Sequence, residues 1–255
     1  MTTLEANSLW IASDFCLATT RNVPDTQLAE MIYQKVCRTG FAAPGFCLVD
    51  LGQDVASKTL RQFMVSLKRL LQQIHQSLAH RDLAFLSAAR FDQQVTTKLH
   101  RDGGPDECFL MLGYEPSPVS AEILLADYSR CAHDRGLTPS ELLEKHNPMF
   151  GPGEELLRPY ITRVACFSNR NSQILLINNS VTPYSNAGDA WQGVLHTATV
   201  HNASDAFRRV VNSTMVASVP LHAMEPVSTA EQEKFITTDV VRRRGYDKTH
   251  LDDDM

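Results

Sequence analysis

The sequence predicts a mainly β fold with flanking helices (α+β), in which a cupin-like double-stranded β-helix, or jelly roll, is supported by N-terminal helices. Three observations predict it. Two amphipathic helical segments come first, about eight short apolar runs divided by turn residues follow, and no repeat or linker divides the 255 residues. One domain can bury a large core at this length. We therefore expect a jelly-roll domain over 1–225, with a helical insert at about 127–159 and a C-terminal tail over 226–255.

The two N-terminal segments have the three- and four-residue spacing of amphipathic helices. In 24–40, Asp25 is a plausible cap after a proline, one face is apolar, and Gly40 marks the end. In 58–80, apolar residues from Leu60 to Leu78 recur at helical steps, which makes this segment the most regular in the chain. The run FCLVDLG between them predicts a buried strand.

From Leu83 onward the apolar runs become short and are divided by turn-forming residues, a pattern typical of a sheet or barrel. The predicted strands are LAFLSAARF, QQVTTKLH, ECFLMLGYE and AEILLAD before the insert, and YITRVACFS, SQILLINNS, GVLHTATVH and FRRVVNSTMVAS after it. Within the insert, Thr138-Pro139-Ser140-Glu141 predicts a capped helix start, and NPMFGPGEE predicts a loop. The tail from about Pro226 ends in RRRGYDKTHLDDDM, whose charge blocks predict a solvated terminus.

Composition and missing motifs exclude several classes of function. The chain has 24 Lys and Arg against 29 Asp and Glu, so its net charge of −5 does not favour nucleic acid or anionic lipid. No apolar run approaches the roughly 20 residues of a membrane-spanning helix, and six scattered cysteines without a CxxC pair are typical of reduced thiols. Phosphate-loop, GxSxG and HExxH motifs are absent. We expect a cytoplasmic protein with a small-molecule substrate and no nucleic-acid or membrane partner.

The motif LHRDGG, at the end of the predicted strand QQVTTKLH, carries the candidate site. Residues two apart on a strand point the same way, so His100 and Asp102 can place an imidazole nitrogen and a carboxylate oxygen on one metal ion. His196, on a later predicted strand, is a candidate third ligand. Two histidines and one carboxylate form the facial triad of non-haem Fe(II) oxygenases, which leaves the other metal positions open. The alternative interpretation of His-x-Asp is an ordinary surface turn.

Together, LHRDGG, AEILLAD, GVLHTATV and FRRVVNST resemble the Fe(II)- and 2-oxoglutarate-dependent dioxygenase superfamily, in its phytanoyl-CoA hydroxylase-like and taurine dioxygenase-like pattern. The resemblance implies that His100, Asp102 and His196 bind Fe(II). It also implies that Arg209 or Arg208 holds the far carboxylate of 2-oxoglutarate, which a planar guanidinium can bind bidentately. The implied reaction consumes 2-oxoglutarate and O₂ and hydroxylates, or otherwise oxidises, the substrate. The resemblance covers about 83–218.

The chain departs from the family pattern around the cosubstrate. Both arginines lie further from the distal histidine than is usual, and strand alternation does not choose between them. We prefer Arg209, because Val210-Val211 continue the strand after it. Ile123 stands where some members have a threonine that helps to bind 2-oxoglutarate. Lys98, on the same predicted face as the first histidine ligand, could take that role.

His201 competes with His196 as the distal ligand. The two lie five residues apart, so on a regular strand they point to opposite faces and only one faces the metal. The family-like context Gly-Val-Leu-His favours His196.

Two other classes of protein stay open. The first is a cupin-like metal enzyme without 2-oxoglutarate, in which the same three ligands hold a metal and Arg209 has no cosubstrate role. The second is a metal-free jelly-roll binding or scaffold protein, in which LHRD is a turn. The insert lies between the two parts of the metal motif, where it could act as a lid or a substrate loop.

Overall fold

The computed structural model describes residues 8–181 and 190–243, which form two β-sheets and several helices. The larger sheet contains β1 (Cys16–Ala18), β2 (Phe46–Asp50), β3 (Asp82–Asp92), β4 (Cys108–Tyr114), β7 (Gln173–Asn178), β9 (Val210–Val219) and β10 (Arg242–Arg243). The smaller sheet contains β5 (Ala121–Ala126), β6 (Ile161–Arg163) and β8 (Leu195–Val200). Helices and strands are thus mixed, and the described strands do not close into a barrel.

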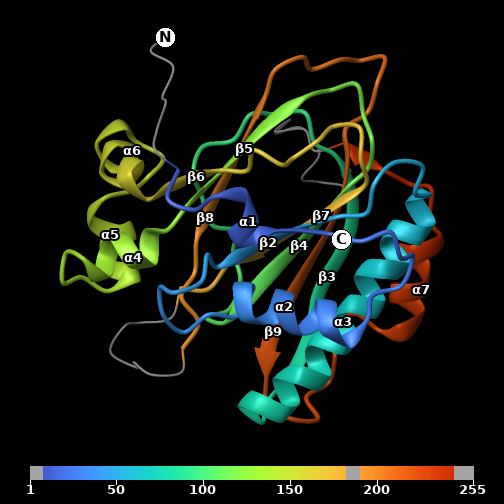
Figure 1. The fold of residues 1–255 in the computed structure, drawn as a ribbon, viewed down its shortest axis with the longest axis horizontal. Coiled ribbons are helices and arrows are strands. Elements are labelled where there is room, and N and C mark those ends of the chain that lie inside the picture. The colour runs from blue at the N-terminus through green and yellow to red at the C-terminus, as the bar shows by residue number, and fades with distance from the viewer. Residues whose placement is uncertain (1–7, 182–189, 244–255) are drawn as a thin grey trace, which may run out of the picture.

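The strand order brings together segments that are far apart in the sequence (Figure 1). The larger sheet has the order β1-β2-β7-β4-β9-β3-β10 and the smaller sheet the order β6-β5-β8. All neighbours from β2 to β3 are antiparallel, whereas β1 and β10 add to the two edges in parallel. Strands β3, β4, β5 and β7 confirm the predicted strands at these places, because their apolar runs are buried in the sheets.

The predicted strand QQVTTKLH forms an irregular segment instead. It runs beside β8 through single hydrogen bonds, such as Thr97 N to Ala198 O at 3.0 Å, and His100 and His196 form an isolated antiparallel bridge. The Thr96 and Thr97 hydroxyls accept hydrogen bonds from backbone N–H groups of β8 at 3.0 Å. In a regular β-ladder, backbone carbonyls would accept these hydrogen bonds. Because the threonine hydroxyls accept them instead, the segment does not form a regular strand despite its strand-like sequence pattern.

Three helices cover one face of the larger sheet, namely α2 (Thr26–Val36), α3 (Ser57–Ala79) and α7 (Thr229–Thr237). The first two confirm the predicted helices. The Asp25 side chain caps α2 by accepting a hydrogen bond from Leu28 N at 2.9 Å. α3 ends at His80, whose φ of 52° is left-handed. Their apolar faces pack against sheet residues such as Phe85 and Met111 in one buried cluster. A short helix, α1 (Ala12–Phe15), precedes β1.

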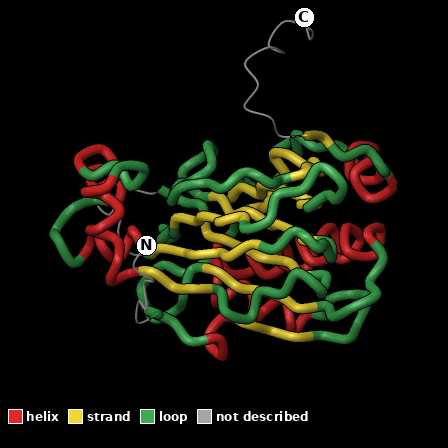
Figure 2. The backbone as a smooth tube through the Cα atoms, turned by 90° about the horizontal axis from the view of Figure 1, so that it is seen from above, coloured by secondary structure: helices red, strands yellow, loops and turns green. Residues whose placement is uncertain are grey.

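The insert between β5 and β6 consists of α4 (Tyr128–His133), α5 (Pro139–Lys145), α6 (Gly151–Leu157) and the 3₁₀ turn η1 (Arg158–Tyr160). It lies at one end of the sheets, away from α3 and α7 (Figure 2). α5 has the predicted capping box between Thr138 and Glu141. The predicted loop NPMFGPGEE contains α6, because Pro152 suits a first turn and Gly153 lies so close to Asn147 O that a Cβ would be 2.3 Å away.

A buried ion pair holds the base of this insert. The Arg38 and Asp127 side chains are each 2% exposed, and they form two hydrogen bonds of 2.5 and 2.8 Å. Asp127 also caps α4 by accepting a hydrogen bond from Arg130 N at 3.0 Å. Arg38 donates further to Gln192 O at 3.0 Å, which connects the insert to the segment before β8.

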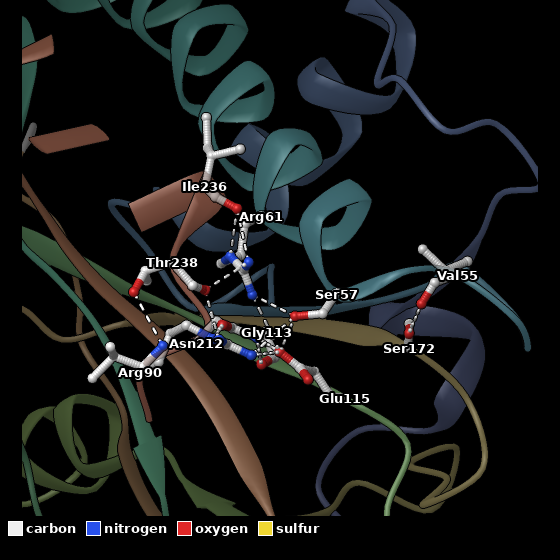
Figure 3. Close-up of polar contacts among 11 residues, drawn as sticks. Val55, Ser57, Arg61, Arg90, Gly113, Glu115, Ser172, Asn212, Ile236 and Thr238 are labelled. Atoms are coloured by element: carbon white, nitrogen blue, oxygen red, sulfur yellow. Dashed lines mark hydrogen bonds and ion pairs between the residues drawn. The ribbon is translucent and has the colours of Figure 1, made fainter. Parts of the chain in front are cut away.

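The predicted solvated tail contains an ordered, packed segment. In α7 the side chain of Ile236 is buried, and its carbonyl accepts hydrogen bonds from Arg61 Nε and Nη2 at 3.0 and 2.7 Å (Figure 3). Arg90 Nη1 donates to Thr238 O at 2.7 Å, and both arginines contact Glu115. α7 thus packs against the larger sheet, and buried arginines far away in the sequence satisfy carbonyls at its end. The charged run 242–255, on which the solvated terminus was predicted, lies almost entirely outside the described residues. Residues 244–255 lie outside the described part.

The cysteines are free thiols, and four of the six are buried. Burial raises the pKa of the Cys131 thiol to about 11, so this group stays protonated at neutral pH. Within 8–181 and 190–243, no helix combines the length and apolar character needed to cross a membrane.

A buried histidine on α3 is expected to make the stability depend on pH. His75 is 1% exposed, and burial, aided by Arg81, lowers its pKa from 6.5 to about 4. Between about pH 6.5 and pH 4 the unfolded chain therefore binds a proton that the folded protein does not. The free energy of unfolding should fall by about 2 kcal/mol between pH 7 and pH 5 because of this residue. Urea unfolding at both pH values measures this change.

The matched variants for this measurement are His75→Gln, which cannot titrate, and His146→Gln, which removes an exposed histidine. His75→Gln should lose less stability than wild type between the two pH values, whereas His146→Gln should lose as much as wild type. An equal loss in all three proteins would show that His75 does not cause it.

Candidate metal centre

Three side chains from two segments meet beside the start of β8. The backbones of His100 and His196 exchange hydrogen bonds of 3.0 and 2.9 Å, which places their rings 4.3 Å apart between centroids. One ligand atom from each of His100, Asp102 and His196 lies within 4.8 Å of the other two. His100 Nε2 is 3.5 Å from Asp102 Oδ1. The irregular segment before β4 therefore brings the predicted His-x-Asp motif to the predicted distal histidine.

The spacing and chemistry of these donors suit a divalent cation. Two ligand atoms at adjacent octahedral positions, with bonds of about 2.1 Å, are about 3 Å apart, which is close to the observed 3.5 Å. His100 Nδ1 lies 2.7 Å from Lys98 O. A carbonyl can only accept a hydrogen bond, so Nδ1 carries the proton and Nε2 carries the lone pair that a metal ion needs.

Asn179 holds the backbone of Asp102. It directly follows β7 and is fully buried. Asp102 N donates to Asn179 Oδ1 at 3.1 Å, and Asn179 Nδ2 donates to Asp102 O at 2.9 Å. This pair of bonds orients the carboxylate from a distant part of the sequence. Asn179 was not among the predicted site residues, because only the polar residues that end the run SQILLINNS mark it in the sequence.

A pocket extends from the candidate metal ligands His100, Asp102 and His196 to Arg209. Its walls are formed by Phe91, Gln93, Thr97, His100, Asp102, Leu112, Tyr114, His196, Ala198, Arg209, Val211 and Ser213. Arg209 is 3% exposed, and its Nη1 donates to Gln93 O at 3.0 Å. Its Nη2 is buried and has no hydrogen-bond partner among the described residues. Because an unsatisfied buried donor costs free energy, a ligand carboxylate at this place would be favoured.

Tyr114, which was not among the predicted site residues, lines the same pocket. The guanidinium carbon of Arg209 lies 5.1 Å from its ring centre. Burial raises the pKa of the Tyr114 phenol, an effect that Arg209 opposes, so the hydroxyl stays protonated and can donate a hydrogen bond. Alternation along β4 marks Tyr114, because it shares the face of Leu110 and Leu112, which is packed between the two sheets.

The other residues predicted from the sequence lie outside this group. Arg208 is exposed just before β9. Lys98 is exposed and donates to Met149 O at 2.7 Å, because its segment is not the regular strand that would turn it inward. His201 is exposed just after β8. Ile123 is buried among apolar side chains and does not line the pocket.

These positions define what the pocket can bind. Two imidazoles and a carboxylate can hold a divalent cation. In the same pocket, a buried guanidinium beside a phenol can bind the carboxylate of a small molecule. No protein-family model matches this chain, and no curated protein matches it either.

Proposed function

We propose that this protein is an Fe(II)- and 2-oxoglutarate-dependent oxygenase that hydroxylates, or similarly oxidises, a small molecule. One observation carries the proposal: the His-Asp-His group and Arg209, with its unsatisfied Nη2, line one pocket. His100, Asp102 and His196 would hold Fe(II). Arg209 would bind the far carboxylate of 2-oxoglutarate, and it is favoured over Arg208 because only Arg209 is buried in the pocket.

We propose further that the two sheets are the halves of a jelly roll. The order of segments supports this, because the chain passes from sheet to sheet. β3, β4, β7 and β9 belong to the larger sheet, whereas the segment 93–100, β5, β6 and β8 lie in or beside the smaller one. Eight antiparallel segments divided in this way between two sheets are typical of a jelly roll. The pocket would then lie between the sheets, where many cupin-like proteins bind their ligands.

When bound, Fe(II), 2-oxoglutarate and O₂ would supply the oxidising chemistry: one oxygen atom of O₂ would enter succinate, the other would enter the hydroxylated substrate, and CO₂ would be released from 2-oxoglutarate. The residues of this chain would bind the metal ion and the cosubstrate and hold the ligand side chains in position. The hydrogen bond from His100 Nδ1 to Lys98 O fixes the imidazole, and Asn179 fixes Asp102. Apolar walls such as Leu112 and Val211 exclude water around Arg209 and so strengthen its attraction for a carboxylate.

A cytoplasmic location and a small-molecule substrate belong to the same proposal. Six free thiols suit a reducing compartment, and a pocket bounded by single side chains suits a small ligand. The net charge of −5 gives no support to a nucleic-acid substrate.

The proposal is tested by an anaerobic titration with Fe(II) and then 2-oxoglutarate, monitored by visible absorbance. Wild type is expected to develop the metal-to-ligand charge-transfer band of a chelated 2-oxo acid. The band should be lost in Asp102→Ala, which removes one ligand, and should persist in Asp239→Ala, which removes an exposed carboxylate. Metal binding without the band would favour a cupin-like metal enzyme. Absence of metal binding would leave a metal-free jelly-roll binding protein.

A further inference from the structure

A second cavity lies where the ends of α2 and α3 meet one end of the larger sheet. Its volume is about 900 Å³, which is within the range of small-molecule sites. It shares no lining residue with the pocket that contains His100, Asp102, His196 and Arg209. Its walls include the charged side chains of Arg81, Glu107 and its neighbour Asp106, the hydroxyls of Tyr33 and Ser218, and the ring of Trp191.

Three of these residues form a row across adjacent strands. Arg81 precedes β3, Ser218 lies on β9 and Glu107 precedes β4, and these strands are neighbours in the sheet. Ser218 N donates to Glu107 O at 3.0 Å, and Arg81 Nε donates to Ser218 Oγ at 2.7 Å. Glu107 lies directly beside Ser218, whereas Arg81 lies two residues before Leu83, the register partner of Ser218, and reaches the serine through its side chain.

The two charges at the ends of this row do not neutralise each other. Within the described part of the chain, neither Arg81 nor Glu107 forms an ion pair. Arg81 is held in place because its Nη2 also donates to Ser218 O at 3.0 Å. Glu107 is held through Oε1, which accepts a hydrogen bond from Trp191 N at 3.2 Å. A fixed cation and a fixed anion that face one cavity are complementary to a ligand with both charges.

The wall between the charges is polar but uncharged at neutral pH, and it is flanked by apolar surface. His75 forms hydrogen bonds through both ring nitrogens, from Nδ1 to Tyr33 Oη at 2.8 Å and from Nε2 to Ser218 Oγ at 3.0 Å. Burial keeps this imidazole neutral, because it lowers the pKa of His75 to about 4. Trp191 packs on His75 with ring centroids 5.2 Å apart, and Leu78, which also lines the cavity, is 67% exposed.

We propose that this cavity binds a small zwitterion of the amino-acid class with an apolar side chain, either a free amino acid or a short peptide. Its carboxylate would pair with Arg81 and its ammonium group with Glu107, while Tyr33 and Ser218 offer hydroxyls between them. The apolar side chain would contact Trp191. The site needs no metal ion, so its existence is independent of the oxygenase function.

The test is isothermal titration calorimetry on the metal-free full chain. L-leucine and glycyl-L-leucine represent the free amino acid and the peptide. N-acetyl-L-leucine keeps only the negative charge, and L-leucinamide keeps only the positive charge. At least one zwitterion should bind, and it should bind at least tenfold more tightly than either singly charged analogue. The tighter zwitterion identifies which of the two ligand sources the cavity prefers.

Two variants assign the charges. Arg81→Gln should weaken zwitterion binding at least tenfold and leave the affinity for L-leucinamide unchanged. Glu107→Gln should weaken zwitterion binding and leave the affinity for N-acetyl-L-leucine unchanged. Glu107→Gln retains an acceptor for Trp191 N, so the fold is preserved even where Arg81→Gln lowers the melting temperature. Arg69→Gln and Glu233→Gln, outside the cavity, are the controls. The proposal fails if no zwitterion binds at 10 mM, if the singly charged analogues bind equally well, or if neither cavity variant changes the affinity.

Discussion

Replacement of His196 by alanine is expected to weaken the binding of Co(II) or Fe(II) by at least about 100-fold. Loss of a residue that merely orients a ligand already costs about 10–100-fold in metal affinity, and His196 is itself one of the three proposed donors. A Co(II) absorbance titration under anaerobic conditions measures the effect. His100→Ala should behave in the same way, because its Nε2 is the second imidazole donor.

The matched control for His196→Ala is His201→Ala, which removes the exposed histidine that the sequence alone left as a competing ligand. It should bind Co(II) as wild type does. If His201→Ala lost metal binding and His196→Ala retained it, the arrangement of the centre would be refuted. If both retained it, the three-residue group would not be a metal site.

Replacement of Arg209 by alanine is expected to raise the dissociation constant of 2-oxoglutarate by about 100-fold and to leave Fe(II) affinity unchanged. Each hydrogen bond to a charged group contributes about 1.5–3 kcal/mol, and a guanidinium offers two of them to a carboxylate. The midpoint of the charge-transfer band during a 2-oxoglutarate titration gives the dissociation constant. The dissociation constant of Arg209→Lys should lie between those of wild type and Arg209→Ala, because lysine keeps the positive charge but cannot form two parallel hydrogen bonds to a carboxylate.

Arg208→Ala is the matched control, since Arg208 is adjacent in sequence but exposed. Melting temperatures check the fold, because Arg209 also donates to Gln93 O and lies over Tyr114. A folded Arg209→Ala protein that binds 2-oxoglutarate as tightly as wild type would favour the cupin-like metal enzyme. An equal loss in both variants would show that the arginine fork does not select the cosubstrate.

The regular elements were the most predictable part of the fold. The periodicity of 58–80 marks α3, and the Thr138–Glu141 capping box marks the start of α5, because both signals lie within a few residues of the chain. α7 also has a local signal, the capping box between Ser228 and Glu231, which was not used in the prediction. Its packing and the irregular segment 93–100 were not predictable from local patterns. α7 depends on Arg61 and Arg90, and the irregular segment depends on threonine hydroxyls that bond to β8. Such long-range partners leave no local pattern.

By itself, the sequence determined which side chains can act as metal ligands and where helices and most strands form. Residue chemistry and periodicity are local properties, so His100, Asp102 and His196 could be singled out together with two alternatives for the arginine. Only the tertiary structure decided that Arg209 lines the pocket, that Lys98 turns to Met149, and that Asn179 and Tyr114 complete the site. The direction of a side chain depends on strand register and on irregular pairing, which the packing of distant segments sets.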